Sequence, residues 1–319
     1  MTSAAVTRVA AIDCGTNTVR LLIVDRPPTG NGAEPREVLR RSRIVRLGQG
    51  VDATGRLAPE ALERTRVALV DYAADIEAAG VDAARVRFVA TSATRDASNG
   101  GEFLDLVRAT LGPGVQPEVV SGATEAGLAF AGATRELLGG PFPSPYLVVD
   151  IGGGSTELVL GTESVLAARS VDVGSVRLTE RHLHADPPTR AQVAAAVADV
   201  QAALDLVEQV VPVADAATVV VVAGTATTVA ALALGLPAYD SSRVHHTRLS
   251  LAAVDAVTDR LLSLPRAQIA ALPAVEPARA DVLGAGAVIL RTVLERMGSD
   301  DCVASEHDIL DGIAWTVAE

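Results

Sequence analysis

The segments AIDCGTNTVRLLIVD at residues 11–25 and VVDIGGGSTELVL at residues 148–160 decide the fold of this chain. Each reads as an apolar strand, an Asp-x-Gly turn with small hydroxyl residues, and a second apolar strand, which predicts a tight β-hairpin. Asp13 and Asp150 hold the same place in the two copies, 137 residues apart (150 − 13). We therefore predict a duplicated domain.

A hairpin of this kind exposes backbone N–H groups that can hold phosphate oxygens, and the Asp at its base can hold a hydrated divalent cation. The alternative is a simple tight turn capped by a short carboxylate. We expect Asp13 and Asp150 to hold Mg²⁺, with a phosphate clamped between the halves. The predicted phosphate-binding positions are Gly15, Thr16, Asn17, Gly152, Gly153, Gly154 and Ser155.

The composition is that of an ordinary soluble α/β protein, with 49% apolar and 21% charged residues over a length sufficient for two domains. The net charge of −12 argues against duplex nucleic acid as a partner and does not favour anionic membranes. All 27 basic residues are arginine, so every basic phosphate contact must come from a guanidinium. Candidates for such contacts are Arg20, Arg46, Arg177 and Arg279.

Cysteine usage and the N-terminus bear on location. Cys14 and Cys302 fit no disulfide framework or zinc motif and suggest a reducing compartment. Residues 1–8 are polar and lack an apolar signal core. We therefore expect a cytoplasmic protein. His245 and His246 suggest a metal pair, but no third ligand is evident in the sequence, which favours an ordinary loop.

Strands alternate with helices along the chain, which predicts mixed sheets with helices on their faces. A Pro/Gly-rich turn is expected at 27–35, and loops at 91–96, 121–125 and 224–228. Expected strands include 40–47, 86–90, 165–171 and 219–223. Expected helices include 59–80, 102–111, 189–211, 250–263, 279–297 and 307–318.

An ordered set of short motifs resembles the exopolyphosphatase / guanosine pentaphosphate phosphohydrolase family, in its short two-domain form. The motifs follow the family order over nearly the whole chain: AIDCGTNTVR (11–20), RLGQG (46–50), ATSATRD (90–96), VSGATEA (120–126), DIGGGSTE (150–157), AGTATT (223–228), RAD (279–281), SE (305–306) and DG (311–312).

The resemblance implies an α/β fold with two ribonuclease-H-like domains of the actin/hexokinase/Hsp70 superfamily flanking a central cleft. We expect an N-terminal domain over 1–124, a C-terminal domain over 125–304, and a last helix at about 305–319 that packs back on the first domain. A hinge near 123–145 would allow closure on a ligand.

The resemblance also implies roles for particular residues. Glu125 is the expected general base, in a loop where the family carries two consecutive Glu residues and this chain has Thr124 first. Arg95 is expected to clamp a phosphate, with a solvated loop charge as the alternative. Glu157 is expected in the metal or water network, with an ordinary strand charge as the alternative. Gly224 and Thr225 resemble a loop beside a second phosphate or nucleoside position, or a helix cap.

The implied activity is Mg²⁺-dependent hydrolysis of the terminal phosphate of inorganic polyphosphate, with short chains favoured. Guanosine pentaphosphate hydrolysis to the tetraphosphate is the sibling activity, and the sequence shows no guanine pocket that would select it. A non-catalytic alarmone or polyphosphate sensor and a phosphotransferase are further alternatives. The family also implies a homodimer.

Overall fold

The computed structural model describes residues 6–27 and 35–317. The chain divides into two compact units, unit 1 (1–121 and 309–319) and unit 2 (122–308). Most of the turn predicted at 27–35 lies outside the described residues. The expected domain boundaries, hinge and cleft stay predictions.

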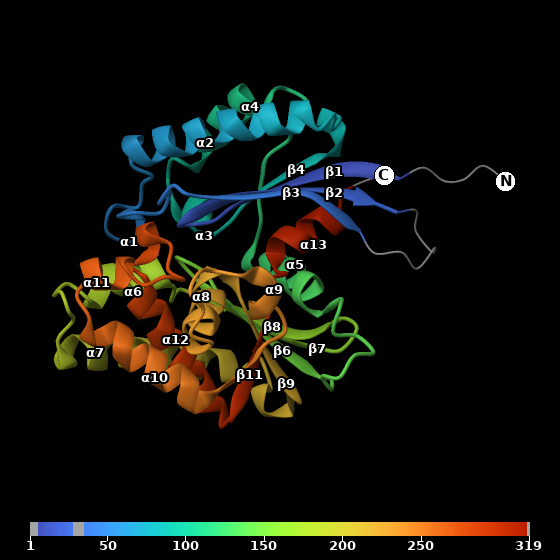
Figure 1. The fold of residues 1–319 in the computed structure, drawn as a ribbon. Coiled ribbons are helices and arrows are strands. Elements are labelled where there is room, and N and C mark those ends of the chain that lie inside the picture. The colour runs from blue at the N-terminus through green and yellow to red at the C-terminus, as the bar shows by residue number, and fades with distance from the viewer. Residues whose placement is uncertain (1–5, 28–34, 318–319) are drawn as a thin grey trace. The chain divides into compact units, whose positions relative to one another are not determined.

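Unit 1 contains a five-stranded sheet in the order β3-β2-β1-β4-β5 (Figure 1). Its first hairpin pairs β1 (Thr7–Cys14) with β2 (Thr18–Arg26), and β3 (Arg36–Ile44) pairs antiparallel with β2. On the other side, β4 (Val86–Ala90) and β5 (Glu118–Val119) run parallel to β1. The predicted duplication therefore begins with a hairpin, as the sequence pattern indicates.

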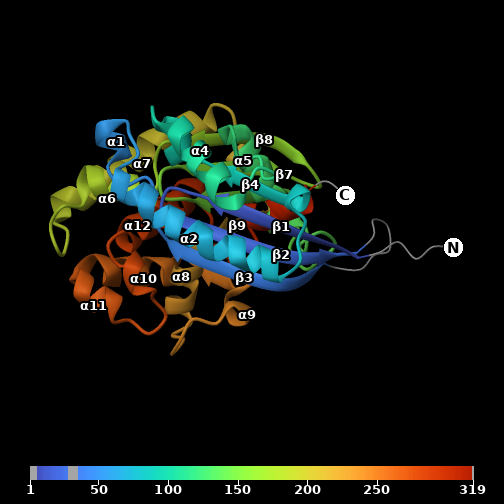
Figure 2. The same cartoon turned by 90° about the horizontal axis from the view of Figure 1, so that it is seen from above.

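Helices cover both faces of this sheet. α2 (Pro59–Ala78) and α4 (Gly100–Leu111) lie on one face, where Leu69, Tyr72 and Phe103 join the core of Phe88. Figure 2 shows α2 lying along that face. α13 (Ile309–Trp315) lies on the opposite face in Figure 1 and contacts β1 and β2, and an ion pair of 2.6 Å joins Asp311 to Arg40 on β3. The short helices α1 (Val51–Thr54) and α3 (Ser92–Asp96) complete unit 1.

Unit 2 repeats this topology with one added strand, in the order β10-β11-β9-β6-β7-β8. β6 (Tyr146–Ile151), β7 (Thr156–Gly161) and β8 (Val165–Val171) form the antiparallel part. β9 (Thr218–Val222) runs parallel to β6, and β11 (Asp301–Ala304) runs parallel to β9. β10 (Arg248–Ser250) pairs antiparallel with β11. The strand order 3-2-1-4-5 shared by both sheets is that of ribonuclease-H-like domains, so the predicted fold class is confirmed.

Side chains of β6 alternate between two cores because successive strand residues face opposite ways. Leu147 and Val149 join the core of α7 (Arg190–Glu208), α10 (Leu251–Ser263) and α12 (Leu283–Met297). Tyr146 and Val148 join the core of α5 (Gly122–Thr134) on the other face. Unit 2 also contains the helices α6 (Ser175–His182), α8 (Ala223–Ala233), α9 (Ser241–Val244) and α11 (Arg266–Ala270).

Three expected loops are largely helical. Of the loop expected at 121–125, residues 122–125 form the first turn of α5. Residues 92–96 form α3, in which the Arg95 N–H donates to the Thr91 carbonyl at 3.0 Å and the buried Ser92 hydroxyl bonds to that of Thr16. Residues 224–228 lie in the first turns of α8, where the Thr228 hydroxyl donates to the Gly224 carbonyl at 2.6 Å. Threonine hydroxyls that bond within the helix are compatible with it, so their turn preference misled the prediction.

Several predicted boundaries move by a few residues. The strand expected at 40–47 is β3 (Arg36–Ile44), and the helix expected at 279–297 begins at Leu283, after a short 3₁₀ turn (Pro277–Arg279). The last helix ends at Trp315 rather than 318. Among the described residues, no helix combines the length and the apolar character needed to cross a membrane.

Candidate active site

The two Asp-x-Gly hairpins have the same turn geometry, one in each unit. In unit 1 the Gly15 N–H donates to the Thr18 carbonyl at 3.0 Å, and in unit 2 the Gly152 N–H donates to the Ser155 carbonyl at 3.0 Å. Asp13 and Asp150 are each the next-to-last residue of their strand, and both are buried. The equivalence predicted from the sequence therefore extends to individual hydrogen bonds.

The strand register also places equivalent polar residues side by side in each sheet. Across unit 1, Asp13 on β1 faces Arg20 on β2, which faces Ser42 on β3. Across unit 2, the corresponding row is Asp150, Glu157 and Ser170. Residues directly opposite each other in an antiparallel pair lie close enough for their side chains to interact. The single difference of kind places a guanidinium, Arg20, in the row of unit 1 where the row of unit 2 has a carboxyl group, Glu157.

In unit 1 the row is neutralised. Oδ2 of Asp13 accepts hydrogen bonds from Nε and Nη2 of Arg20, at 2.9 and 2.6 Å. The neighbouring turn is fixed by a hydrogen bond of 2.9 Å between the hydroxyls of Thr16 and Ser92. Asp13 therefore reaches any cation only in competition with a charged guanidinium.

In unit 2 the row carries two acids, Asp150 and Glu157, and a third acid, Glu125, raises the pKa of Glu157. Glu125 on α5, Asp150 on β6 and Glu157 on β7 are all buried. Burial raises the pKa of Glu157 well above its ordinary value, and the charges of Glu125 and Asp150 raise it further. Hydrogen bonds from Ser170, at 2.6 Å, and from Ser155 act in the opposite direction.

A neighbouring segment holds the backbone of each hairpin loop. In unit 1 the N–H groups of Val45 and Arg46 both donate to the Asn17 carbonyl at 2.9 Å. In unit 2, N–H groups at the start of α6 donate to the carbonyls of Gly152 and Gly153. A Cβ at Gly174 would lie 2.5 Å from the carbonyl oxygen of Gly153, so only glycine permits this packing. The loop carbonyls are therefore engaged from one side.

The loop amides are available as donors. Within the described part of the chain, the backbone N–H groups of Thr16, Asn17, Gly153 and Gly154 form no hydrogen bond. Consecutive free amides in a tight turn form a concavity that favours an anion. The geometry fits the predicted phosphate contacts at these positions, whereas the Gly15 and Gly152 amides are used inside their own turns.

The remaining predicted site residues have mixed environments. In unit 1, Nη1 of Arg95 donates to the Val120 carbonyl at 3.2 Å. In unit 2, Arg279 packs on Gly224, where a Cβ would lie 2.1 Å from the guanidinium Nη1. Thr225 is buried against α12, because a Cβ at Gly286 would lie 2.4 Å from its hydroxyl. The predicted phosphate contacts of Arg95, Gly224 and Thr225 stay predictions. The prediction for Thr225 has the least support, because its side chain is buried.

Sequence reasoning missed Ser170 and Ser92, whose partners are Glu157 on another strand and Thr16 in the first hairpin turn. The only sequence signal for Ser170 is its match with Ser42 in the other copy, which is visible once the register is known. The sequence also gave no sign that His245 lies beside Glu136 and His307, since these three residues are distant in the chain.

Two sheets of ribonuclease-H-like strand order, each with an Asp-x-Gly hairpin, and the buried carboxylates of unit 2 suit an enzyme of phosphoryl-transfer chemistry. Comparison with known proteins gives the family. Residues 24–315 match the model of the Ppx/GppA phosphatase family, and the chain belongs to this family. The resemblance seen in the sequence motifs is confirmed.

Individual relatives align over almost the full length. The chain is 50% identical over 321 residues to Exopolyphosphatase 2 of Mycobacterium tuberculosis, with 98% of this chain and 99% of the relative covered. It is 45% identical to an exopolyphosphatase-like protein of known crystal structure, with a TM-score of 0.91 and coverage of 97% and 98%. A Ppx/GppA enzyme of Aquifex aeolicus is 33% identical, with a TM-score of 0.78 and coverage of 98% and 100%.

Proposed function

We propose that this protein is an exopolyphosphatase, which hydrolyses the terminal phosphoanhydride bond of inorganic polyphosphate with the help of Mg²⁺. The observation that carries the proposal is the buried group of Glu125, Asp150 and Glu157, beside a glycine loop with free amides. The relative named Exopolyphosphatase 2, at 50% identity over nearly the whole chain, supports the same substrate class.

The carboxylates of unit 2 fit a divalent cation. Glu125, Asp150 and Glu157 are all buried, and the charges of the first two raise the pKa of Glu157. Mg²⁺ prefers carboxylate oxygens and water, and we assign Asp150 and Glu157 as residues that would hold it. When bound, the ion neutralises charge on the phosphate oxygens. The proposal retains Asp13 as a further ligand, although Arg20 competes for its Oδ2.

Glu125 is the proposed general base. It lies in the first turn of α5, buried, and its charge acts on Glu157. In the proposed step, water attacks the terminal phosphorus while its proton passes to a carboxylate oxygen of Glu125. The bond between that phosphorus and the bridging oxygen breaks, and the shortened chain leaves with the electron pair. Protonated Glu125 then returns the proton to solvent.

Backbone amides and guanidinium groups bind the phosphate in this proposal. The free N–H groups of Gly153 and Gly154 offer fixed donors whose orientation needs no reorganisation during the reaction. Arg95 and Arg279 supply permanent positive charge in a chain whose net charge is −12. The proposal includes a cytoplasmic location, which the cysteine usage and the polar N-terminus suggest, and a homodimer, which the family resemblance implies.

The test is phosphate release by the purified chain from short polyphosphate, long polyphosphate and guanosine pentaphosphate, each with and without Mg²⁺. Mg²⁺-dependent release from polyphosphate, faster than from the nucleotide, is the expected result. Faster release from guanosine pentaphosphate would transfer the assignment to the sibling activity. Binding of these compounds without any release would make the protein a sensor and overturn the proposal.

A further inference from the structure

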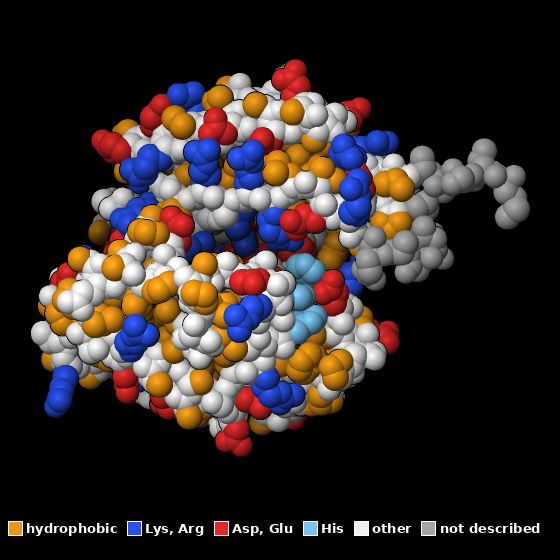
Figure 3. All heavy atoms as spheres, viewed as in Figure 1, with side chains coloured by type: hydrophobic (Ala, Val, Ile, Leu, Met, Phe, Trp, Pro, Cys, Tyr) orange, Lys and Arg blue, Asp and Glu red, His pale blue; other side chains and the backbone are white. Residues whose placement is uncertain are grey.

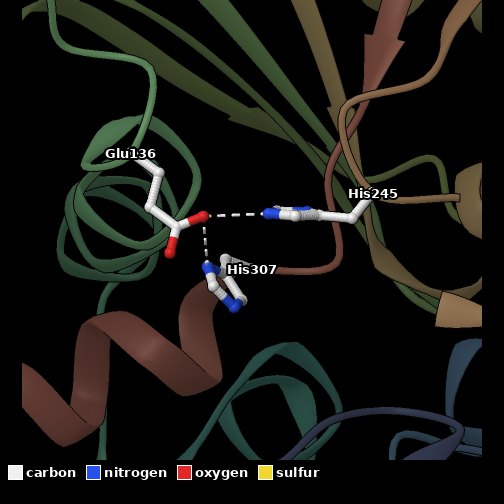
Figure 4. Close-up of side chains that lie close together, drawn as sticks. All are labelled: Glu136, His245 and His307. Carbon is white, nitrogen blue, oxygen red and sulfur yellow. Dashed lines mark hydrogen bonds and ion pairs between the residues drawn. The ribbon is translucent and has the colours of Figure 1, made fainter. Parts of the chain in front are cut away.

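A second group of possible metal ligands lies in unit 2, apart from the carboxylates described above. Glu136 follows α5, His245 follows α9 and His307 precedes α13, and their side chains converge in Figure 4. None of the three is fully buried, and Figure 3 shows histidine side chains gathered on the surface beside an acidic one. The side chains of the group are therefore partly open to solvent.

The spacing of the ligand atoms fits a small tetrahedral ion. Oε2 of Glu136 lies 2.9 Å from Nε2 of His245 and 3.4 Å from Nδ1 of His307, and all three atoms lie within 4.8 Å of one another. Metal–ligand bonds of about 2.0–2.1 Å in a tetrahedron place neighbouring ligands about 3.3–3.4 Å apart. The distance to His307 already has this value, and the distance to His245 needs a small widening.

The histidine rings are held in place by contacts outside the group. The N–H of Glu306 donates to Nδ1 of His245 at 3.1 Å, so Nε2 of this ring carries a proton and donates it to Glu136. His246 stacks on His245 with ring centroids 3.7 Å apart. Nδ1 of His307 is buried and forms no hydrogen bond among the described residues. Nδ1 of His307 therefore gives up no hydrogen bond on binding an ion, whereas Nε2 of His245 must first pass its proton to Nδ1 of the same ring.

The charge of the group is suited to a cation. Burial raises the pKa of Glu136, but the hydrogen bond from His245 and the nearby histidines outweigh it and leave that pKa below its ordinary value. Glu136 is therefore an anionic ligand at neutral pH. Two imidazoles and one carboxylate suit Zn²⁺, Co²⁺ or Ni²⁺, whereas Mg²⁺ selects oxygen ligands.

We propose that Glu136, His245 and His307 form a binding site for a first-row transition metal ion such as Zn²⁺, distinct from the proposed Mg²⁺ ligands. The ion takes the place of the proton between His245 and Glu136, and that ring shifts its proton to Nδ1 at the expense of the Glu306 contact. A fourth position remains for water. The bound ion joins the end of α5 to the segments that follow α9 and β11, and so stabilises unit 2.

The test is titration of the full-length chain with Zn²⁺ in excess Mg²⁺, which occupies carboxylate sites, followed by calorimetry. Co²⁺ titration in parallel should give the intense visible absorption of tetrahedral coordination by nitrogen and oxygen. We expect His245→Ala and His307→Ala to weaken binding by at least about 10–100-fold, the effect of losing even an outer partner of a metal ligand. Glu136→Gln should weaken Zn²⁺ binding as well, because it removes the negative charge and keeps the shape of the side chain.

The matched control is His184→Ala, which removes an exposed histidine outside the group. This variant should bind Zn²⁺ like the parent chain, and circular dichroism should show that all variants are folded. Equal Zn²⁺ affinity in His245→Ala, His307→Ala and His184→Ala would overturn the proposal, as would no Zn²⁺ binding by the parent chain. Because neither readout uses phosphate release, the result is independent of the proposed hydrolase activity.

Discussion

Substitution of Gly132 by alanine should strongly destabilise unit 2, because α5 packs directly on a fixed piece of backbone there. A Cβ at this position would lie 1.8 Å from the carbonyl oxygen of Asp308, and real Cβ atoms essentially never approach closer than 3.0 Å. The two segments must separate by at least 1.2 Å (3.0 − 1.8). The partner segment resists this movement, since the N–H of Ser305 donates to Val221 and Ser305 also bonds to His307.

The expected magnitude follows from two opposing effects. Overpacking of a rigid contact costs about 3 kcal/mol or more at the upper end of its range, and replacing a helical glycine by alanine returns about 0.5–1 kcal/mol. We expect Gly132→Ala to lower the free energy of unfolding by about 2 kcal/mol or more. Gly127→Ala on the same helix has no neighbour within 4 Å and should raise it by about 0.5–1 kcal/mol.

The assay is urea denaturation followed by far-ultraviolet circular dichroism, with the two alanine variants compared with the parent chain. Close packing of α5 on Asp308 predicts opposite shifts of the urea midpoint for the two variants. Midpoints that move together, or a Gly132→Ala variant as stable as Gly127→Ala, would refute the close contact between α5 and Asp308.

Three further predictions concern the site. Without metal, the raised pKa of Glu157 means that the folded state holds a proton which unfolding releases, so the contribution of Glu157 to stability is full at acidic pH and is lost as pH rises. In EDTA, Glu157→Gln should therefore reduce the dependence of the melting temperature on pH. An unchanged pH dependence would contradict the raised pKa. Ser170→Ala removes a hydrogen bond that lowers this pKa, so the acidic limb of the rate profile should move to higher pH, and an unmoved limb would exclude that role. Gly224→Ala should displace the flexible end of Arg279 and raise KM for polyphosphate, with stability changed by less than about 1 kcal/mol, whereas a KM equal to that of Gly127→Ala would remove Arg279 from substrate binding.

The hairpins and the duplication could be predicted from the sequence because their signals are local. Alternating and continuous apolar runs on both sides of Asp13 and Asp150 give the strands, and the glycines between them give the turns. The same local reasoning misplaced residues 92–96, 122–125 and 224–228, which contain residues with a turn preference. In these segments, burial and helical hydrogen bonds outweigh the turn preference of the individual residues. A single sequence does not show which residues are buried.

The candidate site was predictable only in part for a related reason. Asp150 and Glu157 lie in one motif, but Ser170 joins them through strand register, and Arg20 proves to neutralise Asp13 only through a side-chain contact. His245 gave a visible metal signal, but its partners Glu136 and His307 lie 109 and 62 residues away (245 − 136 and 307 − 245). Contacts over such separations follow from topology rather than from local pattern.

The most direct test of the central claim is the rate of phosphate release from polyphosphate, with Mg²⁺ present, by Glu125→Gln compared with the parent chain. We expect a loss of about 10²–10⁴-fold in kcat with polyphosphate binding retained, because glutamine keeps the shape of the Glu125 side chain but cannot accept a proton. Glu163→Gln, at an exposed turn between β7 and β8, is the control and should keep full activity. An unchanged rate in Glu125→Gln would contradict the account.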